Sequence, residues 1–385
     1  MSEHHLVPRA EIERRVSALQ ARLRAVDVRC AMVTSEPNVC YLSGLRTPSF
    51  HSNSRPVVLV VPAEGPTVVV CSRSQAPNVT ASAWVGETRA FDGFETEAEP
   101  VLLDVLGALG GSGDGRVAAE LGADLRLGLS GAAFLRLRSA IGELVDAAPA
   151  LWSIRSLKSD WEISALREAG RVNGLAFDRL RDSYRPGMTE RDLFAVWAAS
   201  VMAAGADSPG YLAMHSGPGN YDRVSGLPGN RAPEPGDLVW LDGGPRWLGY
   251  WSDITRTYSV GAPRPEHAGL YAASRAATLA VGEAIRPGLT TTELFDVVSR
   301  AFRDAGLEIG SATRIGHGVG LQLTEPPSVL PSAPVTLEAG MVLAIEPGIA
   351  RSDGYFNVEE NFLVTPGGAE LLSPPSDPEI LTLGA

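Results

Sequence analysis

Apolar residues recur every three or four positions near the start of the chain, between charged residues. This spacing is typical of one face of an amphipathic helix. The apolar residues at this spacing are Ile12, Val16, Leu19, Leu23 and Val26. Short apolar runs typical of strands come next, at residues 30–34, 57–61 and 67–71. Helix-like and strand-like segments then alternate to about residue 150, which predicts a small α/β domain.

Longer helical patterns begin near Trp152. Ser159 is followed three residues later by Glu162, and this pair forms a capping box that satisfies two backbone donors at a helix start. The boundary is therefore expected between residues 152 and 158, which gives an N-terminal domain over 1–154 and a second domain over 155–385.

An internal repeat organises the second domain. Residues 185–196 (RPGMTERDLFAV) resemble residues 286–297 (RPGLTTTELFDV), 101 positions later. A turn, a threonine cap and an amphipathic helix thus occur twice. A second pair of segments, 235–242 (PGDLVWLD) and 339–346 (AGMVLAIE), repeats at an offset of 104. The repeat predicts two related halves in which Asp242 and Glu346 face each other across a pseudo-two-fold axis.

Each repeated strand is expected to end in a carboxylate. A second strand-like run that carries one or two further carboxylates follows it. A Gly-Gly-Pro segment after Asp242 is expected to turn the chain into a run with Asp253, and residues 357–365 carry Glu359 and Glu360. Aspartate is a poor strand residue and is costly to bury unpaired. One interpretation is an ordinary turn aspartate beside a capped loop. The other is a buried site at which four carboxylates converge.

Four buried carboxylates repel each other unless cations or donors compensate them. His317 lies in the run GHGVG, where flanking glycines leave the imidazole unobstructed. Carboxylates with one neutral imidazole suit two divalent ions, with Mn, Co, Fe and Zn as candidates and Mn preferred. Two such ions would support hydrolysis at neutral pH. The alternative is a hydrogen-bonded carboxylate network without metal, which leaves the repeat and the histidine unexplained.

Composition narrows the class of protein. The chain has 385 residues, 44% hydrophobic content and a net charge of −12, which argues against nucleic acid or an anionic membrane as a main partner. It contains no apolar run long enough for a membrane helix, and its start lacks the pattern of a signal peptide. Cys30, Cys40 and Cys71 show no paired spacing, so we expect reduced core residues in a cytoplasmic protein.

Several motifs together resemble the pita-bread metallohydrolases, which include aminopeptidase P, prolidase, methionine aminopeptidase and creatinase. In the first domain the resemblance rests on Asp27–Thr34 and Tyr41–Gly44. In the second it rests on Arg155–Lys158 with Glu162, and on LDGG, GYWSDITRT, GHGVGL and AIEPGI. It implies a creatinase-type α/β N-terminal domain and an α+β pita-bread catalytic domain with an internal duplication.

The resemblance also implies a set of five metal ligands, with Glu346 serving in catalysis as well. Their separations of 11, 64 and 29 residues through the first four match the shorter prolidase-like members. Counting back from the segment 363–365 selects Glu359 as the fifth ligand, with Glu360 as the alternative. The ligand positions are Asp242, Asp253, His317, Glu346 and Glu359.

The chain departs from the peptidase pattern at three positions. The peptidases carry a histidine between their SGP turn and the first ligand strand, where residues 220–229 contain none. They carry another where this chain has Thr324, and an arginine where it has Asn357. In the family these residues engage the scissile amide and the peptide ends, so ordinary Xaa-Pro cleavage is not expected.

Other residues are candidates for catalysis and substrate recognition. Among the six histidines, His215 precedes the turn at 216–218 and is a candidate proton carrier, or alternatively an ordinary loop histidine. The candidate substrate-binding residues of this region are Tyr221, Asp222, Arg223 and Thr324. In creatinase-like relatives the N-terminal domain of one subunit reaches over the partner's site. The corresponding loop here carries Phe50, His51 and Arg55, which predicts a homodimer in which Arg55 binds a substrate carboxylate.

The leading hypothesis is a hydrolase with two divalent metal ions that cleaves a C–N bond, amide or guanidine-like, in a small molecule or short peptide. An Xaa-Pro dipeptidase or aminopeptidase is the second. A metal-dependent lyase of a small acid and a metal-free binding scaffold on the same fold are further alternatives.

Overall fold

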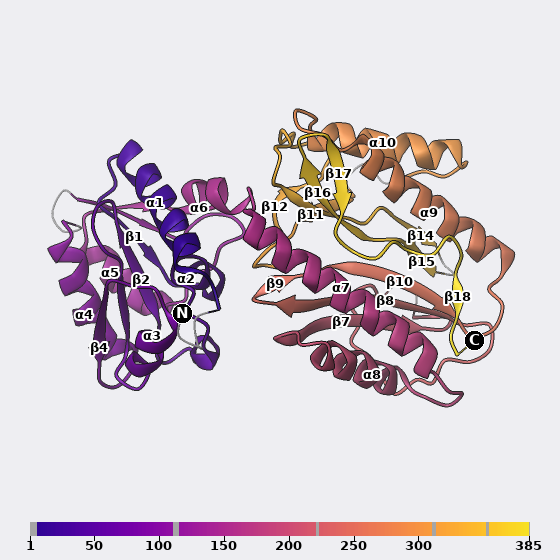
Figure 1. Cartoon of the computed structure of the whole chain (residues 1–385), viewed down its shortest axis with the longest axis horizontal. Helices are drawn as coiled ribbons and strands as arrows, with labels where there is room; N and C mark the ends of the chain where they lie inside the picture. Colours follow the sequence, from indigo (N-terminus) through magenta and orange to yellow (C-terminus); the bar gives the residue numbers. More distant parts are fainter. Residues whose placement is uncertain (1–5, 111–114, 221–222, 310–312, 352–353, 385) are drawn as a thin grey trace. The chain divides into compact units, whose positions relative to one another are not determined.

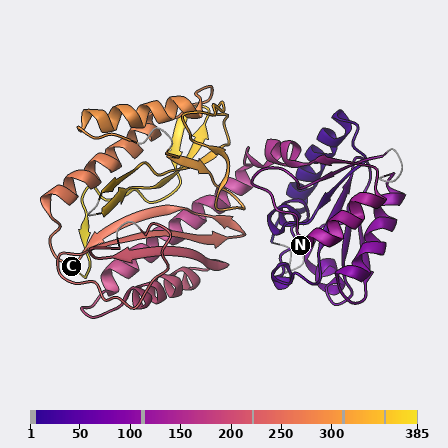
Figure 2. The ribbon, with the colours of Figure 1, turned by 180° about the vertical axis from the view of Figure 1, so that it is seen from behind.

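The computed structural model describes residues 6–110, 115–220, 223–309, 313–351 and 354–384. The chain divides into two compact units, Met1–Arg155 and Ser156–Ala385 (Figures 1 and 2). Among the described helices, none combines the length and the apolar character needed to span a membrane.

The N-terminal unit is built on a six-stranded sheet with the order β4-β3-β2-β1-β5-β6. β1 pairs antiparallel with β2 and parallel with β5. The strands are β1 (Cys30–Val33), β2 (Val58–Pro62), β3 (Val68–Ser72), β4 (Glu87–Phe91), β5 (Arg116–Ala119) and β6 (Glu143–Asp146). The helices are α1 (Arg9–Ala25), α2 (Glu36–Ser43), η1 (Pro48–His51), α3 (Ala76–Ser82), α4 (Glu95–Ala108), α5 (Gly131–Ala140) and α6 (Ala148–Arg155).

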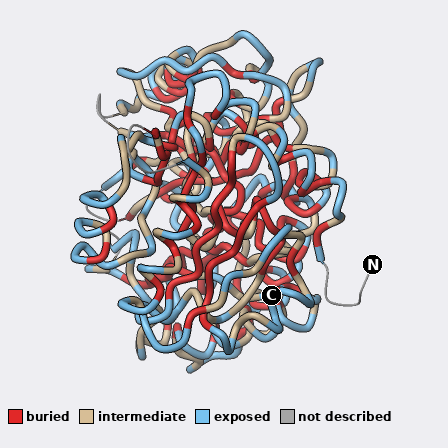
Figure 3. Tube along the Cα trace, turned by 90° about the vertical axis from the view of Figure 1, so that its left-hand side faces the viewer, coloured by how far each residue is buried: buried red, intermediate tan, exposed pale blue. Residues whose placement is uncertain are grey.

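Every residue of β1, β2 and β3 is buried, which explains their unbroken apolar runs. α1 buries Ile12, Leu19 and Leu23, as the spacing of its apolar residues predicts. Cys30 and Cys71 lie in this interior, where burial raises the pKa of the Cys30 thiol to about 12 and that of Cys71 to about 11. Figure 3 shows that buried residues concentrate in the inner strands, while exposed residues follow the peripheral loops.

The C-terminal unit contains two main sheets, each covered by its own pair of helices (Figure 1). One has the order β18-β10-β8-β7, with β9 paired to β8; the other has the order β12-β11-β13-β16-β17. The helices are α7 (Asp160–Ser183), α8 (Glu190–Ala203), α9 (Pro265–Ala284) and α10 (Thr291–Asp304). The strands of the first sheet are β7 (Ser208–Ser216), β8 (Leu238–Trp247), β9 (Tyr250–Trp251), β10 (Ile254–Ser259) and β18 (Leu381–Thr382). The remaining strands are β11 (Gly316–Gly318), β12 (Glu325–Ser328), β13 (Val342–Ile345), β14 (Gly348–Arg351), β15 (Gly354–Asn357), β16 (Glu360–Thr365) and β17 (Gly368–Leu371).

The sequence repeat corresponds to a repeated order of elements. α8 starts after Thr189, whose side chain accepts a hydrogen bond from the Asp192 backbone, and α10 starts after Thr290 in the same way. β8 and β13 begin 104 positions apart, as the second repeat predicts. The pita-bread fold with its internal duplication is therefore confirmed.

Side-chain alternation along β8 and β13 decides which residues face away from the covering helices. Val239 and Leu241 pack in the core that α7 and α8 cover, whereas Leu343 and Ile345 pack in the core beneath α9 and α10. Because neighbouring side chains on a strand point to opposite faces, Asp242 in the first sheet projects away from its helices. The two helix pairs bury the apolar faces, and the polar faces carry the candidate site.

The predicted turn at Gly-Gly-Pro is wrong, because β8 continues through these residues to Trp247. The chain turns instead at Leu248 and Gly249, whose φ angles of 49° and 86° suit a tight hairpin. The glycines serve close packing. A Cβ on Gly244 would lie 2.8 Å from the ring of Tyr211, so the missing side chain lets this ring cross the strand.

The predicted single strand over residues 357–365 is also wrong. β15 ends at Asn357 and β16 begins at Glu360, so that Glu359 lies in the break between them. Outside a regular ladder, its side chain is not tied to the alternation of either strand.

Candidate metal centre

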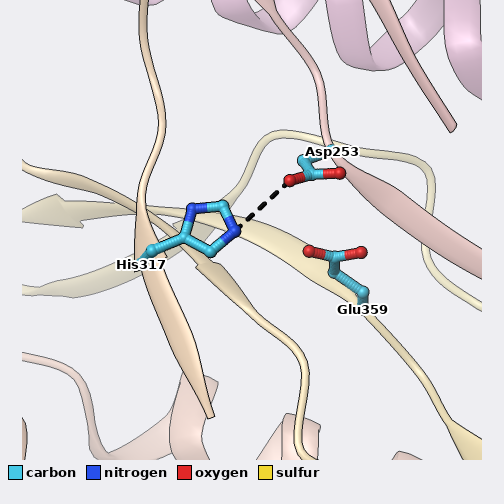
Figure 4. Close-up of side chains that lie close together, drawn as sticks. All are labelled: Asp253, His317 and Glu359. Carbon is cyan, nitrogen blue, oxygen red and sulfur yellow. Dashed lines mark ion pairs between the residues drawn. The ribbon is translucent and has the colours of Figure 1, made fainter. Parts of the chain in front are cut away.

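Three ligand-competent side chains come together between the two sheets of the C-terminal unit. One ligand atom from each of Asp253, His317 and Glu359 lies within 4.8 Å of the others, and all three residues are buried (Figure 4). His317 Nε2 is 3.4 Å from Asp253 Oδ2 and 3.7 Å from Glu346 Oε1. Four of the five ligands expected from the resemblance are thus linked by these distances.

Tyr211 connects the fifth expected ligand to this group. Its hydroxyl lies 2.5 Å from Asp242 Oδ1 and 2.7 Å from Asp253 Oδ1. Asp242 stands opposite Thr255 in the β8–β10 ladder, and Asp253 lies directly before the first residue of β10. The five expected ligands therefore surround one small volume.

Hydrogen bonds between the two sheets hold Asp253 in place. The Asp253 backbone N–H donates to Asn361 Oδ1 at 3.0 Å, and Asn361 Nδ2 donates to the Asp253 carbonyl at 2.6 Å. Thr255 Oγ1 donates to Glu359 Oε2 at 2.8 Å. Asn361 and Thr255 fix the orientation of the ligand carboxylates, as outer partners commonly do at metal sites.

Glu359 and Glu360 differ in what their carboxylates bind. Glu360 is fully buried and accepts hydrogen bonds from Arg256 Nη2 at 3.1 Å, from Ser373 Oγ at 2.6 Å and from the Ser376 backbone N–H at 2.6 Å. This carboxylate is compensated by a cation within the fold. Glu359, in contrast, belongs to the cluster around His317. The geometry favours Glu359 over Glu360 as a metal ligand.

The His317 ring presents the nitrogen that a metal needs. His317 Nδ1 lies 2.9 Å from the Gly318 carbonyl, which can only accept, so Nδ1 carries the proton. Nε2 then has a free lone pair directed at Asp253 and Glu346. Burial lowers the pKa of His317, which favours the neutral ring at neutral pH.

The carboxylates are buried together without enough cationic compensation from the chain. Burial raises the pKa of Asp253 and that of Glu346 to about 7, and it raises the pKa values of Asp242 and Glu359 well above their ordinary range. Without a cation the ionised carboxylates of such a cluster repel each other. Divalent cations bind there favourably, because they stabilise the ionised forms. The oxygen-rich donor set with one imidazole fits the divalent metals expected from the sequence.

A cavity of about 280 Å³ opens onto this cluster. Its polar wall includes Thr324, which is a predicted substrate-binding residue, and Arg314. Its apolar wall is formed by Leu212, Ala213, Val224, Leu227 and Leu323. The cavity is large enough for a small substrate beside the metal site.

The other predicted site residues lie elsewhere. His215 is 1% exposed, stacks on Trp240 with ring centroids 4.8 Å apart, and is not among the residues that line the cavity. Arg223 is exposed and does not line the cavity either. Tyr221 and Asp222 lie outside the described residues.

The loop with three further candidates belongs to the N-terminal unit. Phe50 is half-buried there, while His51 and Arg55 are exposed. The Arg55 guanidinium lies over the ring of Phe94, 5.1 Å from its centroid. This contact keeps the arginine at the surface of its own unit.

Sequence reasoning missed Tyr211 and Arg314. Tyr211 belongs to no motif, and only the glycines opposite it hinted at a close approach. Arg314 stands three residues before His317, and a single basic residue at this position gives no distinct signal in the sequence. A chain of hydrogen bonds behind Glu359 was also missed: Trp240 Nε1 donates to Asn357 Oδ1 at 2.6 Å, and Asn357 Nδ2 donates to Thr255 Oγ1 at 3.3 Å.

Comparison with known proteins agrees with this geometry. Residues 164–366 match metallopeptidase family M24, and residues 15–157 match the creatinase/prolidase N-terminal domain. The chain belongs to metallopeptidase family M24. It is accordingly a metal-dependent hydrolase of the type that cleaves amide bonds, and it requires divalent metal ions.

Relatives cover nearly the whole chain. A probable dipeptidase PepE of Mycobacterium bovis is 33% identical over 371 residues, which span 94% of this chain and 94% of the relative. The crystal structure of dipeptidase PepE from Mycobacterium ulcerans is 28% identical with a TM-score of 0.84, covering 98% of this chain and 99% of that one. A recombinant prolidase from Thermococcus sibiricus has a TM-score of 0.86 at 24% identity, with 96% and 99% coverage, and shows the shared fold.

Proposed function

We propose that this M24 hydrolase uses two divalent metal ions to cleave a C–N bond, amide-like, in a small substrate. The observation that carries the proposal is the convergence of four carboxylates and one neutral imidazole beside a single cavity, which all of them except Glu359 line. The proposed ligands are Asp242, Asp253, His317, Glu346 and Glu359. Manganese is the preferred ion, with cobalt, iron and zinc as the alternatives.

Bound ions would polarise the substrate carbonyl and lower the pKa of water. The reaction adds water across the C–N bond and releases an acid and an amine. Glu346 is the residue suited to move the proton, because its carboxylate lines the cavity 3.7 Å from His317 Nε2, beside the proposed metal ligands. Tyr211 holds Asp242 and Asp253 in a fixed relation through the two hydrogen bonds of its hydroxyl group.

Two features argue against simple Xaa-Pro dipeptides as the preferred substrates. Thr324 lines the cavity at the position where the peptidases carry a histidine. Asn357, which replaces the family's arginine, is engaged by Trp240 and Thr255 and has no charge to offer a substrate. The second candidate function is a dipeptidase, including an Xaa-Pro dipeptidase, which the name of the relative from Mycobacterium bovis favours.

Dipeptide turnover distinguishes these candidates. The manganese-loaded protein should hydrolyse Ala-Pro at least about 100-fold more slowly than a prolidase assayed beside it, because lost proton-transfer groups cost 10²–10⁴ in rate. Thr324→His should raise this activity, whereas Gln322→His, two residues away and outside the cavity, should not. Rapid cleavage of Ala-Pro by the unmodified protein would instead establish the dipeptidase.

The remaining proposals concern assembly and compartment. A homodimer, in which the loop with Phe50, His51 and Arg55 approaches the partner's cavity, follows from the resemblance to creatinase-like enzymes. The net charge of −12 speaks against nucleic acid and anionic membranes as partners. In the part of the chain that the structure describes, Cys30, Cys40 and Cys71 form no disulfide, in keeping with a reducing compartment such as the cytoplasm.

A further inference from the structure

Arg314 stands at the wall of the catalytic cavity. Among the described residues that line this cavity, it is the one arginine or lysine. Its Nη2 lies 3.4 Å from Glu346 Oε1, and 40% of its side chain is exposed. A separation of 3.4 Å is longer than that of a well-formed N–H···O bond, so this ion pair is a loose one. The guanidinium therefore keeps donors for another partner.

The charge balance of the site favours an anionic partner. The carboxylates of Asp242, Asp253, Glu346 and Glu359 carry four negative charges when ionised, which two divalent ions match. Arg314 then adds a positive charge to the cavity that none of these carboxylates balances. An arginine in such a place suits a carboxylate, because the planar guanidinium can donate two parallel hydrogen bonds.

Part of the lining of the cavity is apolar and partly exposed. It includes Val224 and Leu227, which are 39% and 78% exposed, and the buried residues Leu212 and Ala213. An exposed leucine at the mouth of a catalytic cavity is suited to contact an apolar substituent of the substrate. The cavity thus combines one cation with one apolar surface.

Resting on the function proposed above, we propose that Arg314 is the specificity-determining residue that binds the free α-carboxylate of the substrate. The substrate is then an N-acyl α-amino acid with an apolar side chain, in which the acyl group is a small acid or another residue. This assigns to Arg314 the carboxylate contact that the sequence suggested for Arg55.

Arg314 lies close to the proposed metal ligands, so a carboxylate bound to it would lie near the scissile bond. Arg314 contacts Glu346, and Glu346 lies 3.7 Å from His317 Nε2. An α-amino acid suits this arrangement, because its carboxylate carbon is only two bonds from the amide nitrogen.

A pair of substrates that differ only in this charge tests the assignment. N-acetyl-leucine and N-acetyl-leucinamide are compared by acetate release, with manganese-loaded protein. The unmodified protein should prefer the acid by about 10–100-fold in kcat/KM, the value of a charge-assisted hydrogen bond. Arg314→Met should remove most of this preference, mainly through KM, and Arg314→Lys should retain part of it. Arg303→Met, an exposed arginine on α10, is the matched control and should keep the preference.

The ratio of kcat/KM for the acid to kcat/KM for the amide shows whether Arg314 recognises the substrate carboxylate or only positions Glu346. An equal loss for both substrates in Arg314→Met, or a loss of bound manganese, would mean that Arg314 only positions Glu346 and would overturn the proposal. Loss of the preference in Arg55→Ala, with Arg314→Met unaffected, would assign the carboxylate to the N-terminal loop instead.

A binding measurement keeps this test independent of catalysis. Calorimetry with leucine and leucinamide on the manganese-loaded protein should show tighter binding of leucine, and Arg314→Met should abolish the difference. Equal binding of the two ligands would refute the role of Arg314. Hydrolysis of neither acetylated substrate, together with no manganese uptake, would refute the proposed function itself.

Discussion

At the scale of single residues, the identity of the neighbours of each carboxylate decides its role. Glu360 has Arg256 and two further donors and is fully compensated within the fold. The carboxylate of Glu359 accepts a hydrogen bond from the Thr255 hydroxyl and that of Asp253 from the Tyr211 hydroxyl, and both carboxylates lie beside His317. The charge of Glu360 is therefore balanced without a metal ion. Glu359 and Asp253 require a bound cation to remain ionised.

Removal of one proposed ligand should therefore reduce metal binding directly. We expect about two divalent ions per chain in the unmodified protein and the loss of at least one in His317→Ala or Asp253→Ala. Elemental analysis after dialysis against metal-free buffer measures this. His51→Ala, an exposed histidine in the other unit, is the matched control and should retain its metal. A native protein without metal, and without uptake at micromolar Mn or Co, would contradict the proposed centre.

The ligand positions could be predicted because their chemistry repeats along the sequence. Asp242 and Glu346 occupy equivalent positions in two repeated segments of the sequence, and His317 has glycine neighbours. Tyr211 could not be predicted, since its contact with two aspartates depends on glycines in a facing strand rather than on its own neighbours. The stacking of His215 on Trp240 could not be predicted for a similar reason, because it arises only from the pairing of β7 with β8.

At the scale of elements, the site lies between two sheets. Each sheet packs its apolar face against its own pair of helices. The repeated helix starts at Thr189 and Thr290 were predictable from local capping residues. The course of β8 through Gly-Gly-Pro and the break before Glu360 were not. Both depend on close contacts between strands, which override the local preference of glycine for turns.

The packing of the two sheets brings ionisable carboxylates together, and this makes the stability of the metal-free protein depend on pH. The folded protein holds protons on Asp253 and Glu346 up to a pKa of about 7, whereas the unfolded chain releases them near pH 4. Between these values the folded state binds more protons, so its free energy of unfolding falls as the pH rises. Metal binding replaces the protons and removes this loss.

The stabilisation by manganese should consequently grow with pH. The gap in Tm between manganese-loaded and chelator-treated protein should widen by on the order of 5 °C from pH 5 to pH 8. Thermal melts at several pH values measure it, and groups outside the site cancel in the difference. Glu346→Gln lacks one of the raised pKa values and should show a smaller widening. Parallel curves with and without metal would argue against coupling between these carboxylates and the ion.

At the scale of the whole molecule, the chain carries an N-terminal unit that supplies none of the proposed metal ligands. All five belong to the C-terminal unit, whose repeat is sufficient to build the centre. An exposed loop with Phe50, His51 and Arg55 on the first unit is then available for an intermolecular role. In creatinase-like enzymes that role is to cover the site of a second subunit, and we apply it here as a proposal.

The assembly proposal predicts a kinetic effect from a residue far from the metal. If the partner's loop closes the cavity, Arg55→Ala should raise KM by about 10-fold, the equivalent of roughly 1.4 kcal/mol of lost contact, while metal content stays the same. Because Arg314 supplies the carboxylate contact in our proposal, this rise should be similar for N-acetyl-leucine and for its amide. Light scattering establishes whether the protein is a dimer, and Arg24→Ala, a surface arginine of α1, serves as the control. A fully active monomer, or an Arg55→Ala variant with unaltered KM, would show that the loop of one subunit has no part in the site of another.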